Sequence, residues 1–134
     1  MYINNKAYVT IEGSGLVMDN ANGQANHRCR PSLSINDATL KVNNDVFLSE
    51  DANATTTVDV VNSGWFISDS QNPIRGMCIS QNAGAKTDVT FNNASTGTVY
   101  MLRVGRGGTL NVTGNSVFEM DGTPTNAVTQ SSNL

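Results

Sequence analysis

The stretch YMLRVGRGGTLNVTGNSVFEMDG, residues 100 to 122, decides the fold class. Apolar and polar side chains alternate on both sides of the GRGG segment at 105 to 108, as they do in β-strands. A glycine-rich phosphate cradle would need a helix after the glycines, because free N–H groups at the helix start meet the anion. Residues 109 to 118 instead continue the alternation. The glycines therefore indicate a corner between two strands.

The composition of the 134-residue chain favours one β domain with many turns, spanning residues 1 to 134. Charged residues make up 14% of the chain, against roughly 25% in an ordinary soluble domain. A net charge of −3 provides no broad basic surface, so nucleic acid and membrane insertion are not expected. No apolar run approaches a membrane span, and residues 1 to 6 do not resemble a secretory leader. We expect any export signal or anchor to lie outside this chain.

Sliding the sequence against itself gives a repeat at an offset of 49 residues. This offset places Val9 on Val58 and Cys29 on Cys78, and it holds from Val9 to Asn44. We interpret it as a duplication. Within each unit, an apolar pair spaced by two residues opens each expected circuit. The pairs are Val9/Ile11, Leu40/Val42, Val58/Val60, Val89/Phe91 and Leu110/Val112.

The spacing of these pairs predicts an all-β fold, a parallel β-helix of about five rungs with a 49-residue double-rung repeat. The steps are 31, 18, 31 and 21 residues (40 − 9, 58 − 40, 89 − 58, 110 − 89), and such periods are typical of solenoids or propellers. An 18-residue step is too short for a four-stranded propeller blade. Stacked circuits about 4.8 Å apart would shield their inward side chains. The first residues of the five pairs should therefore stand in one file.

A second apolar strand follows most pairs, at 16–17, 47–48, 65–66 and 117–118. The fourth circuit lacks a clear equivalent, because residues 92–97 intervene before Val99. The long circuits should release loops at 19–24 and 69–73, where variable function would be found. Four aromatic residues are predicted to fill core columns rather than a sugar platform, with Trp65 the first candidate for an exception. They are Phe47, Trp65, Phe66 and Phe118.

The segment LRVGRGGTLNVTG, residues 102 to 114, resembles the repeats of autotransporter passengers and of exosortase (PEP-CTERM)-sorted surface proteins. Looser versions are CISQNAGAKTDVTFNN at 78 to 93 and LSINDATLKVNN at 33 to 44, where Asn36 and Asn43 replace the glycines of the family pattern. The resemblance implies a right-handed β-helix in an extracellular stalk or adhesin at the cell surface. The matching positions are Leu102, Val104, Gly105, Gly108, Leu110, Val112 and Gly114.

The two cysteines, Cys29 and Cys78, are not expected to pair. Equivalent positions two rungs apart would be separated by about 2 × 4.8 Å, which exceeds the limit of ~7 Å between the Cα atoms of a disulfide. We expect buried or half-buried thiols that act as small apolar residues.

An acidic residue recurs after the second strand of most circuits. A column of calcium sites is one interpretation, since Ca²⁺ takes oxygen ligands. Solvated turn residues are favoured, because the fourth rung breaks the column and the calcium-binding repeat GGxGxD is absent. Calcium binding stays open for these four residues, and no metal ligand is assigned. They are Asp19, Glu50, Asp69 and Asp121.

Five arginines precede the apolar pairs and suggest one lateral face, which pectate-lyase-like helices would use for β-elimination. We favour surface charges, because the arginines keep no fixed offset and no acidic cluster joins them. The arginines are Arg28, Arg30, Arg75, Arg103 and Arg106.

The single histidine, His27, lacks partners for a zinc site or a hydrolytic triad. The N-glycosylation sequons at Asn53, Asn93 and Asn111 are expected from the composition of the chain.

We therefore expect a structural or adhesive module of the cell surface, a stalk or filament segment without catalytic, cofactor-binding or metal-binding residues. Its expected partners are further copies stacked end to end, flanking repeats, and a cell-surface glycan or protein. Neither residues 1–6 nor residues 123–134 form a convincing cap, so truncation or self-association is predicted. A trimeric phage tail or capsid-decoration protein and a pectate-lyase-like enzyme remain as alternatives.

Overall fold

A computed structural model describes residues 1–13, 15–18, 30–49, 53–67, 76–80 and 84–120. Within these ranges the regular structure consists of strands, and no helix occurs. The strands are β1 (Tyr2–Asn4), β2 (Tyr8–Ile11), β3 (Leu16–Met18), β4 (Ser32–Asn36), β5 (Thr39–Val42), β6 (Val46–Leu48), β7 (Thr55–Val61), β8 (Gly64–Ile67), β9 (Met77–Ile79), β10 (Lys86–Asn92), β11 (Thr96–Val99), β12 (Leu102–Val104), β13 (Gly108–Val112) and β14 (Val117–Met120).

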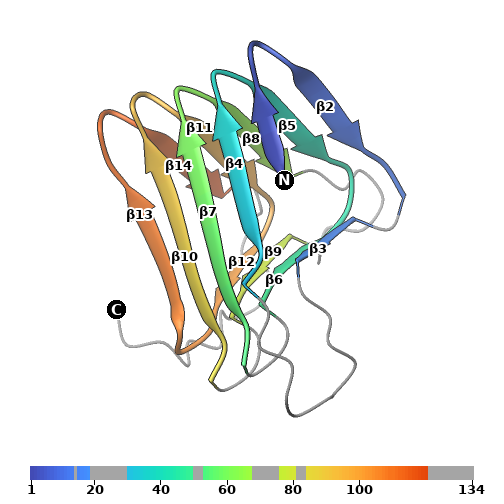
Figure 1. The fold of residues 1–134 in the computed structure, drawn as a ribbon, viewed down its shortest axis with the longest axis vertical. Coiled ribbons are helices and arrows are strands. Elements are labelled where there is room, and N and C mark those ends of the chain that lie inside the picture. The colour runs from blue at the N-terminus through green and yellow to red at the C-terminus, as the bar shows by residue number, and fades with distance from the viewer. Residues whose placement is uncertain (14, 19–29, 50–52, 68–75, 81–83, 121–134) are drawn as a thin grey trace.

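The described strands form three sheets in which every pairing is parallel. Sheet A has the order β1-β4-β7-β10-β13, sheet B the order β2-β5-β8-β11-β14, and sheet C the order β3-β6-β9-β12. Every third strand along the chain returns to the same sheet. Figure 1 shows the strands of sheet A side by side, with β1 and β13 at opposite edges. The fold is therefore all-β with parallel sheets, consistent with a β-solenoid.

Alternation within the strands places the core between the three sheets. In β7, Thr56, Val58 and Val60 are buried, whereas the residues between them are exposed. Successive side chains of a strand point to opposite faces, so each sheet has one inner and one outer face. The pairing registers then align the inner side chains in columns. The longest are Ile3–Ile35–Val60–Phe91–Val112 in sheet A, and Val9–Leu40–Trp65–Gly97–Phe118 and Ile11–Val42–Ile67–Val99–Met120 in sheet B.

Aromatic rings fill the middle of the core. Trp65 stacks on Phe91 with ring centroids 6.3 Å apart, and Phe91 meets Phe118 edge to face at 5.2 Å. Gly97 lies between the last two rings, because a Cβ atom there would come within 2.6 Å of both Phe91 and Phe118. The absence of a side chain at this core position therefore makes room for two rings from neighbouring columns.

Serine hydroxyls satisfy the backbone where the chain turns from sheet A to sheet B. Ser63 Oγ accepts a hydrogen bond from the Ala38 N–H at 3.1 Å, and Ser95 Oγ accepts one from the Ser63 N–H at 3.2 Å. Ser116 Oγ accepts in turn from the Ser95 N–H at 3.0 Å. Each serine thus binds the turn before it, which pairs amide groups that burial would otherwise leave without partners.

A second polar ladder lies where the chain passes from sheet C to sheet A. Ser49 donates to Thr56 at 2.6 Å and Ser80 donates to Thr87 at 3.0 Å between side-chain oxygens, and all four residues are buried. In the last described turn, Gly105 takes the place of Ser80, because a Cβ atom there would lie 1.8 Å from the Ser80 carbonyl oxygen. The predicted corner at residues 105 to 108 is confirmed, with Gly108 as the first residue of β13.

The prediction of a single file through the five apolar pairs is wrong. Val9 pairs with Leu40 in sheet B, but Leu40 continues to Trp65. Val58 belongs to sheet A, where it lies between Leu33 and Val89. The 49-residue offset therefore superimposes residues of two different sheets, and the 18-residue step from Leu40 to Val58 is not a full turn. One turn takes 25 residues from Leu33 to Val58 (58 − 33).

The predicted second strands all exist, but they do not share one sheet. Residues 16–17 and 47–48 lie in sheet C, whereas residues 65–66 and 117–118 lie in sheet B. The expectation that the fourth circuit lacks such a strand is wrong, because β11 pairs with both β8 and β14. Its inward positions are Gly97 and Val99, and a glycine such as Gly97 indicates a turn in the sequence.

Of the four aromatic residues predicted to fill the core, two lie on the inner faces of the sheets and two on the outer faces. Trp65 is 1% exposed, and Phe118 packs half-buried against the core, so both are core residues as predicted. Phe47 and Phe66 lie at alternate, outward positions of β6 and β8 and are half-buried. Their assignment to core columns is wrong, because the strands place Val46 and Leu48, or Trp65 and Ile67, on the inner face instead.

Candidate functional site

Many of the residues singled out in the sequence lie outside the described part of the chain. The calcium and disulfide expectations therefore stay predictions, as do the two loops at 19–24 and 69–73. Cys78 itself is buried on β9, in register with Phe47 and Arg103 of the neighbouring strands. The residues outside the described ranges are Asp19, His27, Arg28, Cys29, Glu50, Asp69, Arg75 and Asp121.

The three described arginines do not form one column. Arg103 is exposed on β12 of sheet C, whereas Arg30 and Arg106 are exposed just before strands of sheet A. The sequon residues Asn93 and Asn111 are exposed, Asn93 at a left-handed corner and Asn111 on β13. The three described arginines therefore lie beside two different sheets, Arg103 on sheet C and the other two just before strands of sheet A.

Within the described ranges, no three His, Cys, Asp or Glu side chains gather closely enough to hold a metal ion. The same part of the chain contains no helix with the length and apolar character needed to cross a bilayer.

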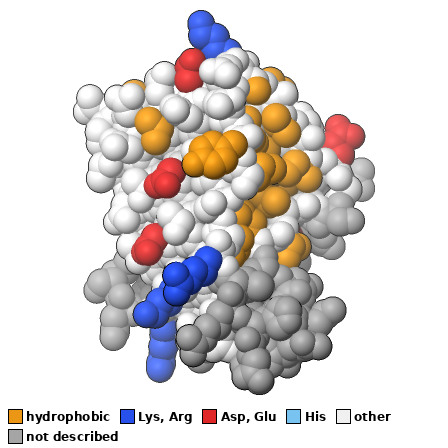
Figure 2. All heavy atoms as spheres, in the orientation of Figure 1, with side chains coloured by type: hydrophobic (Ala, Val, Ile, Leu, Met, Phe, Trp, Pro, Cys, Tyr) orange, Lys and Arg blue, Asp and Glu red, His pale blue; other side chains and the backbone are white. Residues whose placement is uncertain are grey.

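The N-terminal end of the coil leaves apolar side chains uncovered. Val9 and Ile11 on β2 are half-buried, whereas Leu40 and Val42, the next residues of the same columns, are 0% exposed. Strand β2 is an edge of sheet B and has no described neighbour on its other side. Figure 2 shows hydrophobic side chains gathered in a band beside the N-terminal strands. The exposure therefore arises from the absence of a further turn in the described chain.

The C-terminal end repeats this arrangement. Val112 is 40% exposed, whereas Phe91 before it in the column is 0% exposed. Met120 is 61% exposed, and Val99 before it is 0% exposed. Strands β13 and β14 are the edges of their sheets among the described strands. Edge strands present unpaired N–H and C=O groups that invite another chain.

The two ends complement each other chemically. All described strands of a sheet run in the same direction, so a second copy translated along the coil could pair its first strands with the last strands of the copy before it. Its Ile3 would then follow Val112 in the long column of sheet A. Val9 would follow Phe118 in sheet B. Each apolar column would continue through the junction with an apolar residue.

The sequence placed the columns wrongly, and the predicted lack of a cap at residues 123–134 lies outside the described residues. Comparisons of the chain with protein-family models, with curated proteins and with solved structures found no match.

Proposed function

We propose that this chain is a structural and adhesive module of the extracellular cell surface, a stalk or filament segment without catalytic activity. Its fold would be a right-handed parallel β-helix of about five rungs. Stacked parallel turns form a rod whose length grows with the number of turns. Such a rod holds side chains on its outer faces away from whatever anchors its end.

The observation that carries this proposal is the state of the two ends. The columns of sheet B are buried in the middle and only half-buried or exposed at both limits of the described strands, whereas the long column of sheet A is open at Val112 and closed at Ile3, which is 5% exposed. Natural solenoids need terminal turns with a polar outer face to stay soluble as single molecules. Burial of the side chains left open at the described strands would favour a further copy, at about 25 cal/mol for each Å² of apolar surface. We therefore expect end-to-end assembly.

The extracellular and cell-surface setting is supported by the sequence resemblance to autotransporter passengers and exosortase-sorted proteins. The outer face of sheet A supports a structural role. Besides Tyr2 and Lys86 it carries mainly Thr, Asn, Ser and Asp side chains, for instance Thr57, Asp59 and Thr90. The proposal treats these residues as the hydrated side of a rod.

The test is the state of association of the 134-residue chain over a range of concentrations. Sedimentation velocity and electron microscopy should show polymers whose length grows with concentration. Two variants place a charge at the open ends, Ile11→Lys at the N-terminal end and Val112→Lys at the C-terminal end. Each should convert the polymers to monomers, because a buried unpaired charge at the junction is costly.

Thr90→Lys is the matched control, because it adds the same charge on the outer face of β10 in the middle of sheet A. It should leave the polymers intact. A monomer at all concentrations, or end variants that polymerise like the control, would overturn the proposal. A closed trimer would favour the phage-protein alternative, and turnover of acidic polysaccharide would favour the lyase.

A further inference from the structure

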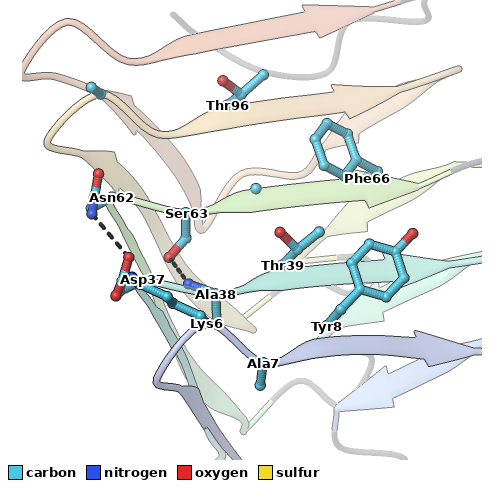
Figure 3. A pocket seen from close by; sticks show the side chains of 12 residues that line it. Lys6, Ala7, Tyr8, Asp37, Ala38, Thr39, Asn62, Ser63, Phe66 and Thr96 are labelled. Carbon is cyan, nitrogen blue, oxygen red and sulfur yellow. Dashed lines mark hydrogen bonds between the residues drawn. The ribbon is translucent and has the colours of Figure 1, made fainter.

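A shallow groove of about 440 Å³ crosses the outer face of sheet B. Figure 3 shows Tyr8 on β2, Thr39 on β5 and Phe66 on β8 on one face of three neighbouring strands. Tyr8 is 66% exposed. Two strand spacings of about 4.8 Å each separate β2 from β8. Both aromatic side chains line this groove.

Gly64 fixes the position of the Phe66 ring. Tyr8, Thr39 and Gly64 are paired in register, whereas Phe66 lies two residues further along β8. The ring folds back over Gly64, because a Cβ atom at Gly64 would lie 2.6 Å from Phe66 Cε2. With any other residue at this position, the ring would have to move away from the groove. A glycine on the outer face therefore places both aromatic side chains over the same column.

Polar groups line one end of the groove. Lys6, Asp37 and Asn62 project there from corners with left-handed backbone, at φ values of 61°, 48° and 48°. Asn62 Nδ2 donates to Asp37 Oδ1 at 3.3 Å, as Figure 3 shows. The end thus offers an ammonium, a carboxylate and an amide within one small region. They supply both donors and acceptors, and the charges of Lys6 and Asp37 cancel.

We propose that this groove binds a neutral hexopyranose unit of a polysaccharide or glycan. The apolar C–H face of a sugar ring packs on aromatic side chains, and Tyr8 and Phe66 offer two such side chains in one groove. The hydroxyl groups of the sugar need both donors and acceptors, which Thr39 and the polar end supply. The balanced charge of the polar end disfavours acidic sugars and nucleic acid.

The groove does not depend on end-to-end assembly. Its walls lie on the lateral face of the rod, and Phe66 is on the third strand of sheet B, away from both ends. Loss of the polymers would leave the sugar site in place, and loss of the sugar site would leave the polymers in place. The two proposals can therefore fail separately.

The test is a titration of the full isotope-labelled chain with four neutral trisaccharides, followed by amide resonances in NMR. The probes are cellotriose, maltotriose, laminaritriose and mannotriose. At least one should shift the amides of Thr39, Gly64 and Thr96, whereas amides of sheet A should stay in place. Phe66→Ala and Tyr8→Ala should each weaken that binding about tenfold through loss of one stacking contact. Gly64→Ala should weaken it as well, by displacing the ring of Phe66.

Phe47→Ala is the matched control, since Phe47 is also an outward, half-buried phenylalanine but lies on β6 of sheet C. It should bind the sugar as the unchanged chain does. Far-UV circular dichroism checks that each variant is folded, and Tyr8→Ala keeps the test valid if Phe66→Ala unfolds. No shift with any trisaccharide would overturn the proposal. So would equal binding by the groove variants, or stronger shifts with N-acetyl-phenylalanine amide, which would indicate a peptide site.

Discussion

The middle turns and the end turns of this coil have similar sequence patterns but very different burial. In the long column of sheet A, Val60 is 0% exposed and Val112 is 40% exposed, although both are inward valines. Val60 has column neighbours on both sides, Ile35 and Phe91, whereas Val112 has only Phe91 among the described residues. Alternation decides which way a side chain points, and the neighbouring turns decide whether it is buried.

This difference has a thermodynamic consequence. Each inner side chain gains most of its stabilisation from the turns above and below, so the stability of such a coil is close to a sum over turn interfaces. The same substitution should therefore cost more in the middle than at an end. The following predictions test this comparison, beginning with the largest expected effect.

Replacement of Phe91 by alanine should have the largest effect. Phe91 is fully buried between Trp65 and Phe118, so Phe91→Ala should lower the free energy of unfolding by about 3–5 kcal/mol. Phe118→Ala, on the edge strand β14, should cost less than half as much, because Phe118 is already half-buried. Urea unfolding followed by circular dichroism measures both. Equal costs would contradict the comparison.

The two valines of the long column in sheet A give a sharper test of the difference between the middle and the end. Val60→Ala should cost about 2 kcal/mol, from two lost methylene equivalents at ~0.8 kcal/mol each plus a cavity term. Val112→Ala should cost less than about 1 kcal/mol, because its side chain is partly hydrated already. The side chain removed is identical, so a difference in urea midpoint at constant slope reports the neighbours alone. Indistinguishable midpoints would show that the C-terminal end is covered in solution.

The polar ladder between sheets C and A allows the middle and the end of the structure to be compared through a hydrogen bond. Thr87 Oγ1 accepts from Ser80 and donates to the Leu48 carbonyl at 3.4 Å inside the coil. Thr87→Val keeps the shape but removes the acceptor of the buried Ser80 hydroxyl, whereas the Leu48 carbonyl still accepts from the Ser80 N–H at 2.9 Å, so the variant should cost about 1–3 kcal/mol. Thr109→Val, on the exposed face of β13, should stay within about 0.5 kcal/mol of the unchanged chain. Thermal unfolding of both variants provides the measurement. If Thr87→Val were as stable as the unchanged chain, the polar ladder would not contribute to stability.

The smallest effect on stability is expected at the sugar groove. Tyr8 is 66% exposed at the edge of sheet B, so Tyr8→Ala should change the unfolding free energy by no more than about 0.5 kcal/mol. The same variant should weaken sugar binding about tenfold, which separates the role of Tyr8 in recognition from any role in the fold. A large loss of stability would instead assign Tyr8 to the packing of the N-terminal end.

Several parts of the fold could be predicted from the sequence, for reasons visible in particular residues. Alternation of apolar and polar residues around residues 105 to 108 predicted two strands, and the glycines between them predicted a corner. Glycine is needed at this corner because Gly105 lies close to the Ser80 carbonyl oxygen. Trp65 was correctly placed in the core. Strand β11 was missed because Gly97 carries no side chain at the inward position. The glycine is there to accommodate Phe91 and Phe118, which lie far from it in the sequence.

The groove on sheet B was missed for a related reason. Tyr8, Thr39 and Gly64 are separated by about a turn each, and nothing in the sequence shows that they are paired in register. Phe66 was assigned to the core because it directly follows Trp65. Only the strand's alternation, with Trp65 inward, places Phe66 on the outer face. A pairwise register between β5 and β8 was the missing information.

The sequence by itself determined that this chain forms short strands, which side of most strands is apolar, and where glycine turns the path between β12 and β13. These properties depend on neighbouring residues, through alternation with a period of two and through backbone conformation. The tertiary structure decided which residues share a column, since turns of unequal length erase any fixed offset. Leu40 therefore meets Trp65 instead of Val58, and the same registers decide which apolar side chains lie uncovered at the two ends.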